Sequence, residues 1–458
     1  MSNSISVAPT LSRFIPDPEV RYNNAVTLAT ALVILTSPYW ILRLFEWDTS
    51  GTAFVVVPLI VGFNLLLVIA ASRTDQFLRR CMVGGLLFKV ACASIYLAIA
   101  SDLYNWTIDV YGYMNEGSRW ASQLQTIGKI PILTPLRGTN FITMITGSMI
   151  YVFGPSFAIT AMFYAMLAFW GQFFAYKAFR TAFPNANRKL AAIFLLFFVP
   201  SIVYWTAMVG KDAVLSFSTG LAVYGFAQLT RRLNFAGMLT MGAGLGLMVM
   251  TRGHVAAVFL IAATVSIALQ RNVRGAVGAA TRLVAIPLVL GMTIYIGLQA
   301  SETWSVSDFQ QGLQRQVQAG KDTASGGSAF SQAQSSPVRF AMAPLLMFRP
   351  FPWEIRNWQT LISAAESFWI LVLCWQGRRG LLSVLGRFRA EPMIMFILLY
   401  LFEFLFAFAP GINNFGLLVR QRVMVLPFLM MLLCIPEANR AEGKPLRRAF
   451  RPYLGYSR

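Results

Sequence analysis

Long apolar runs separated by short polar segments are the dominant pattern of this chain. A typical run is about 20 residues long, which is the length an α-helix needs to cross the hydrocarbon core of a bilayer. Backbone in lipid must satisfy its own hydrogen bonds, so such runs are expected to be helical. The pattern predicts an all-α, polytopic membrane protein with about twelve transmembrane helices and interfacial helices on the non-cytoplasmic face. The predicted spans are 25–45, 52–72, 82–101, 155–177, 189–208, 213–230, 235–250, 254–270, 282–299, 357–375, 391–410 and 417–435.

Composition agrees with this class and decides how the charge is interpreted. Of the 458 residues, 57% are hydrophobic and 12% are charged, whereas about a quarter of the residues of a soluble domain are charged. The net charge is +20, but the basic residues lie in short loops between spans, which is the positive-inside pattern of membrane proteins. We therefore expect the lipid bilayer as a partner, and no nucleic acid.

Loop charge also sets the predicted orientation, because Lys and Arg accumulate in cytoplasmic loops. A cytoplasmic N-terminus places the basic loops on one side, whereas loops 46–51 and 411–416 carry no Lys or Arg and fall on the other. The predicted organisation is a cytoplasmic tail (1–24), a transmembrane domain (25–435) and a basic cytoplasmic tail (436–458). The basic loop residues are Arg73, Arg79, Arg80, Lys177, Arg180, Arg188, Lys189, Arg231, Arg232, Arg271, Arg274, Arg282, Arg378, Arg379, Arg387 and Arg389.

The apolar segment Phe141–Phe153 is only about 13 residues long and ends at Gly154-Pro155. If it crossed the membrane, every later basic loop would lie outside. We therefore predict that it lies at the interface, which leaves two sizeable outer segments, 102–154 and 300–356.

The first outer segment contains a candidate catalytic acid. If 106–121 is helical, Asp109, Tyr113 and Glu116 share one face. A carboxylate at the outer edge of a span suits a general base, with the other two residues beside the substrate. An amphipathic interfacial helix with a solvated acidic face would show the same spacing, and both interpretations stay open.

Two predicted outer turns carry further polar groups. Lys211 and Asp212 stand between two apolar runs, either as a simple polar turn or as an acid and a cation at the mouth of the membrane domain. Arg252 and His254 lie at the next outer turn. Arg252 suits an anion contact, and a lone surface His is more often solvated.

Charges inside predicted spans are costly and are functional candidates by default. Arg420 and Arg422 lie near the outer end of the last span, where they either reach the headgroups or clamp a phosphate with their guanidinium forks. Lys89, Glu366 and Glu403 either line a path through the membrane or pair to lock helices together. The sequence shows no nucleotide-binding glycine pattern and no His/Cys metal cluster.

The order of these features resembles a known family. A span at 82–101 precedes the motif Asp109-Val-Tyr-Gly-Tyr113, and an apolar helix ending in Phe-Gly-Pro-Ser (153–156) follows. A further span leads to Val-Pro-Ser-Ile-Val-Tyr-Trp (199–205) and then to Lys211-Asp212. Over roughly residues 82–270 the chain resembles the polytopic GT-C glycosyltransferases, which include the protein mannosyltransferases and the aminoarabinose transferase of lipid A.

The resemblance implies a membrane enzyme that uses a polyprenyl-phosphate-linked sugar as donor and a glycan, glycolipid or protein hydroxyl as acceptor. Asp109 would be the catalytic base, and Asp212 would take the second acidic position, near the active site or as a ligand of Mg or Mn. The reaction would invert the sugar. The expected location is a bacterial inner membrane, with the active site facing the periplasm, in cell-envelope synthesis.

Two other functions remain open on the sequence. A polysaccharide polymerase or ligase would share the lipid-linked donors but depend on arginine rather than aspartate. A lipid-linked sugar transporter or flippase would instead use Lys89, Glu366 and Glu403 inside the membrane.

Overall fold

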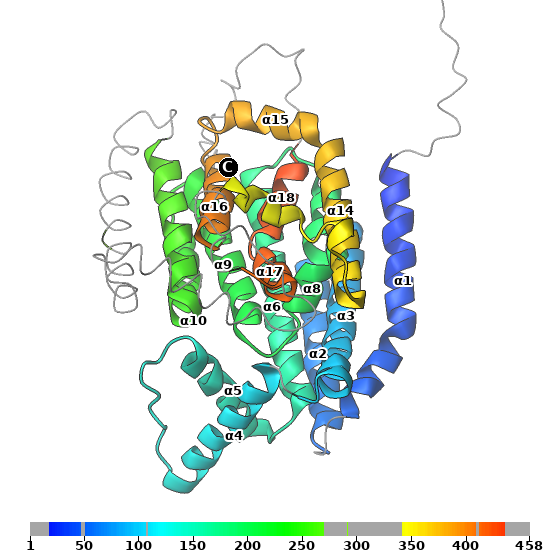
Figure 1. Cartoon of the computed structure of the whole chain (residues 1–458), viewed down its shortest axis with the longest axis vertical. Coiled ribbons are helices and arrows are strands. Elements are labelled where there is room, and N and C mark those ends of the chain that lie inside the picture. The colour runs from blue at the N-terminus through cyan, green and yellow to red at the C-terminus, as the bar shows by residue number, and fades with distance from the viewer. Residues whose placement is uncertain are drawn as a thin grey trace, which may run out of the picture.

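The computed structural model describes residues 18–46, 51–106, 109–269, 291, 341–408 and 412–435. These residues form helices and connections, with no strand among them, as predicted (Figure 1). The predicted span 282–299 except residue 291, residues 300–340, residues 1–17 and the tail 436–458 lie outside the described residues. Residues 18–24 of the predicted N-terminal tail belong to a helix instead.

Six described helices are long and apolar enough to cross a membrane, or up to eight if each of two bent helix pairs counts as one span. The predicted number of about twelve is therefore not confirmed in the described part. The six helices are α1 (Pro18–Phe45), α2 (Ala53–Ala71), α3 (Gln76–Ala98, continued by the π-helix Ile99–Leu103), α6 (Phe157–Ala182), α9 (Lys211–Arg231) and α10 (Phe235–Ala268). The bent pairs are α14 (Trp358–Gln376) with α15 (Arg378–Arg387) and α17 (Phe415–Arg422) with α18 (Leu426–Leu433).

The predicted span 189–208 is not a single helix. It consists of α7 (Arg188–Ala192), the π-helix η2 (Ile193–Phe198) and α8 (Pro200–Trp205). Val199 has extended backbone angles (φ −95°, ψ 101°), because the residue before a proline is driven away from helical angles. The span predicted at 391–410 is the shorter helix α16 (Pro392–Phe408), of 17 residues.

Helix α10 covers two predicted spans and is broken between them. Arg252 has non-helical backbone angles (φ −147°, ψ 91°). Before the break, Gly244 lies against the α9 backbone at Ala222. After the break, the ring of Phe259 packs on Phe226 of α9, with centroids 6.5 Å apart. Both halves therefore run along α9, as expected for two spans joined by a turn.

Helices α4 (Asp109–Ile127) and α5 (Thr139–Phe153) pack on each other at one end of the bundle (Figure 1). We call this the site end. Gly117 and Gly147 allow their close approach, because a side chain at Gly147 would collide with Trp120 and with the Gly117 carbonyl. The 15-residue α5 ends at Phe153 and is capped by Gly154 (φ 84°). It is shorter than the candidate spans, and its predicted place at the membrane interface stays a prediction.

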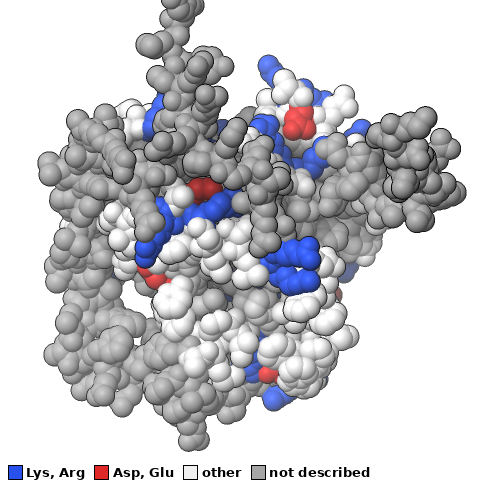
Figure 2. Space-filling view, turned by 90° about the horizontal axis from the view of Figure 1, so that it is seen from above, with Lys and Arg blue, Asp and Glu red and all other residues white. Residues whose placement is uncertain are grey.

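The opposite end carries α15 and the start of α1, and we call it the basic end (Figure 1). Lys and Arg outnumber Asp and Glu on its described surface (Figure 2). Arg231 donates to the carbonyls of Thr181 and Ala182 there, which joins the ends of α6 and α9. The stretch 378–387, predicted as a loop, is helix α15, bent by 66° from α14.

Candidate functional site

Polar residues from α4, α9, α10 and α17 meet around Arg420. Its Nη1 donates to Oδ2 of Asp109 at 2.7 Å, and its Nε donates to Oδ2 of Asp212. Arg252 places Nη2 3.2 Å from the other oxygen, Oδ1, of Asp212. The prediction that Asp109 and Asp212 share one side of the bundle is therefore confirmed, and one guanidinium joins them.

Local backbone features place these groups. Asp109 begins α4, and Asp212 lies in the first turn of α9, where the helix dipole favours a negative charge. Gly210 precedes α9 with φ 152°, an angle that L side chains rarely adopt. The backbone leaves the helical conformation at Arg252, and the side chain of this residue lies against Asp212.

The two carboxylates differ in their access to solvent. The Asp109 side chain is 54% exposed, whereas that of Asp212 is 4% exposed and lies between two arginines. A buried carboxylate persists only when it is compensated in this way. Asp109 is therefore the acid that a substrate can reach, and Asp212 is the acid that organises the arginines.

The site has more positive than negative charge. Lys211 interacts electrostatically with Arg252, Asp109, Arg420 and Asp212, and its Nζ reaches back toward Gly138, before α5. Three cations thus surround two acids. Such a surplus attracts an anion, and guanidinium groups match the oxygens of a phosphate.

Tyr113 lies one turn after Asp109 and is buried against Gly210. Burial, helped by the charge of Asp109 and opposed by Arg420, raises the pKa of the Tyr113 hydroxyl to about 12. This residue therefore stays a neutral donor near neutral pH, beside the accessible acid.

The sequence did not indicate Gln421, which accepts a hydrogen bond from Nη1 of Arg252 at 3.2 Å. Its place directly after Arg420 is the one signal that could have identified it. Gln421 holds the Arg252 side chain from the α17 side, so α17 contributes two adjacent residues to the site.

Two predicted site residues make contacts outside the group around Arg420. Glu116 forms an exposed pair with Arg119 at 2.8 Å, one turn along α4, so that part of the predicted acidic face is solvated. The ring of His254 packs edge-on against Phe408 of α16, with centroids 5.4 Å apart.

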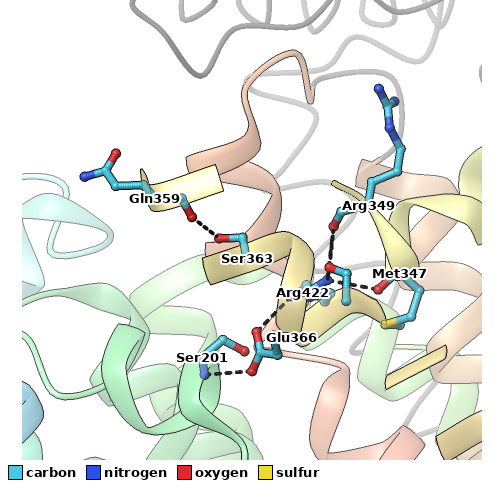
Figure 3. A network of polar contacts seen from close by, with 8 residues as sticks. Ser201, Met347, Arg349, Gln359, Ser363, Glu366 and Arg422 are labelled. Atoms are coloured by element: carbon cyan, nitrogen blue, oxygen red, sulfur yellow. Dashed lines mark hydrogen bonds and ion pairs between the residues drawn. The ribbon is translucent and has the colours of Figure 1, made fainter. Parts of the chain in front are cut away.

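Arg422 belongs to a separate buried network (Figure 3). Its guanidinium pairs with Glu366 at 3.0 Å and donates to Ser367 Oγ at 2.7 Å. It also donates to the carbonyls of Met347 and Arg349, each at 3.1 Å. The predicted pair of phosphate-binding arginines is therefore divided, and Arg420 alone joins the acids.

The predicted intramembrane charges mostly tie helices together. Lys89 is fully buried and donates to Thr206 Oγ1 and, at 3.4 Å, to Gln172 Oε1. Glu366 pairs with Arg422. Glu403 lies half-buried on α16.

A divalent cation does not fit this arrangement. Asp109 and Asp212 both bind Arg420, whose charge repels a metal ion at the same oxygens. Within the described ranges, no three His, Cys, Asp or Glu side chains come together as metal ligands. The geometry therefore gives no support to Asp212 as a ligand of Mg or Mn.

No protein-family model, curated protein or solved structure matches the chain.

Proposed function

We propose that this protein is a membrane glycosyltransferase that moves a sugar from a polyprenyl-phosphate donor to a hydroxyl acceptor, in the synthesis of a cell-envelope glycan or glycolipid. The observation that supports it is the Asp109–Arg420–Asp212 group at the site end. It combines an accessible carboxylate with a surplus of cations, which are the two needs of sugar transfer from a phosphate.

The proposed reaction is a single displacement. Asp109 takes the proton of the acceptor hydroxyl as that oxygen forms a bond to the anomeric carbon. The bond from this carbon to the phosphate oxygen breaks, and the lipid phosphate leaves with the electron pair. The configuration at the anomeric carbon is thereby inverted.

The cations would bind the donor and stabilise the leaving group. A guanidinium has five N–H donors, and Arg420 uses Nε and Nη1 for the two acids. Phosphate binding at Arg420, helped by Arg252 and Lys211, draws the guanidinium from Asp109 and leaves that carboxylate able to accept a proton. In this proposal the site end faces the periplasm, because the basic end has the charge of a cytoplasmic face.

A polysaccharide polymerase or ligase is the second candidate. The central place of Arg420, with two further cations beside it, favours it. Such an enzyme would need the arginine more than Asp109. A transporter or flippase has less support, since Lys89 and Glu366 are engaged in contacts between helices.

The experiment compares surface glycans and glycolipids, by mass analysis, from cells with the protein, without it, and with single variants. Asp109→Asn is expected to reduce the product about 10²- to 10⁴-fold, the usual contribution of a general base. Asp102→Asn is the matched control, because Asp102 is an exposed acid just before α4 that hydrogen-bonds to its neighbour Ser101.

Both variants must be present in membranes at the wild-type level. Full product with Asp109→Asn would eliminate Asp109 as the base. If Arg420→Lys then abolished the product, the arginine-dependent polymerase or ligase would be the better assignment.

A further inference from the structure

The carboxylate of Glu366 on α14 binds two different helices, one through each oxygen. It is buried, with 9% of the residue exposed. Oε2 pairs with Arg422 of α17 at 3.0 Å, and Oε1 accepts the backbone N–H of Ser201 in α8 at 2.9 Å (Figure 3). Ser201 lies in the first turn of α8, where an N–H lacks a partner within its own helix.

Each of these helices leads to one part of the candidate site. Arg420 lies two residues before Arg422 on α17. On the other side, α8 ends at Trp205, and the connection 206–210 joins it to Lys211 and Asp212. Glu366 therefore links the segment that carries Arg420 to the segment that carries Asp212.

This link resists displacement because its groups are charged and enclosed. The Arg422 and Glu366 side chains are 2% and 7% exposed. Removing one member of a buried pair leaves the other charge uncompensated, which is strongly unfavourable. Ser367 and the carbonyls of Met347 and Arg349 hold the same guanidinium from further directions.

We infer that Glu366 and Arg422 are positioning residues that hold α17 against α8 and thereby fix Arg420 on Asp212. Neither residue contacts Asp109 or Asp212 among the described contacts, so both act through Arg420. The effect on transfer rests on the proposed function, whereas the effect on the position of Arg420 does not.

The test uses Glu366→Gln, which keeps the size of the side chain and removes its charge. Glu391→Gln is the control. Glu391 pairs with Arg387 at the end of α15, with side chains 32% and 25% exposed. Both substitutions remove the acid of an ion pair, but only Glu366 joins α17 to α8.

The first readout needs no activity. Phenylglyoxal modifies accessible arginines, and peptide mass spectrometry of the full-length protein in detergent gives the rate at Arg420. Exposed Arg119 serves as the internal reference. Because Glu366→Gln removes the charged partner of Arg422, it is expected to speed modification of Arg420 roughly tenfold. Glu391→Gln is expected to leave the rate within about twofold.

The second readout is the surface glycan formed per molecule of protein. A misplacement near 1 Å costs roughly 100-fold in rate, so Glu366→Gln is expected to reduce the product by about 10- to 100-fold. Residues that act through one another are not additive, so adding Glu366→Gln to Arg420→Lys is expected to change the product by less than about twofold.

A Glu366→Gln protein with a lower melting temperature, but with Arg420 modification and product unchanged, would show that the pair only stabilises the fold and would overturn the inference. If Glu366→Gln does not fold, Ser367→Ala is the milder variant. Its modification rate at Arg420 is expected to rise about threefold. An unchanged rate would also overturn the inference. If the wild type makes no glycan, the proposed function fails, and the modification rates alone decide the positioning role.

Discussion

At the scale of single residues, one guanidinium, that of Arg420, binds both acids of the site. Asp109, Asp212 and Arg420 were all candidates, and the structure joins them. The sequence did not separate Arg420 from Arg422, although residues two apart on a helix point in different directions. The pairing of Arg422 with Glu366, 56 positions away, depends on packing that no local pattern encodes.

The burial of Asp212 gives a prediction about stability. Asp212→Asn removes the negative charge between Arg420 and Arg252, and breaking a buried pair costs about 3–5 kcal/mol. We expect a clear fall in the melting temperature of the protein in detergent. Glu116→Gln is the control, since its exposed pair with Arg119 contributes about 1 kcal/mol or less. Equal effects of the two substitutions would contradict the enclosed state of Asp212.

At the scale of elements, apolar length alone predicted several spans and failed where the backbone breaks. A run of apolar residues indicates a helix, but Pro200 and the extended Val199 before it divide 189–208 into short pieces. The break at Arg252 falls where a turn was predicted. The polar residues between the two apolar runs marked this turn, whereas the ion pair of Arg252 with Asp212 could not be read from the pattern.

The contact between α4 and α5 can be tested with two glycines of α4. A side chain at Gly117 would collide with Thr146 and the Gly147 backbone, whereas one at Gly112 would meet open space. Overpacking costs about 1–3 kcal/mol, so Gly117→Leu is expected to separate the helices and Gly112→Leu to leave them together. Limited trypsin digestion at Lys129 and Arg137, between the two helices, measures this. Faster cleavage in Gly112→Leu than in Gly117→Leu would contradict the described packing.

At the scale of the whole molecule, the two ends differ in a way that follows from the loop charges. The site end brings together groups predicted to share a side, and the basic end collects α15 and the joined ends of α6 and α9 (Figure 1). The number of spans was less predictable, because bent pairs such as α17 with α18 depend on a 54° change of direction between two short helices.

The two ends should lie on opposite sides of a membrane, and cysteine labelling can show it. Tyr111 on α4 is 50% exposed, and Gly386 on α15 is also exposed. Positive charge is retained in the cytoplasm, so a membrane-impermeant maleimide should label Tyr111→Cys in intact cells and Gly386→Cys only after permeabilisation. Cys374 is half-buried and is replaced by Ser in both variants, while Cys81, Cys92 and Cys434 are buried. Labelling of both positions from outside would place the arginines of α15 and the acids of the site in one compartment, which would remove the charge argument for a periplasmic active site.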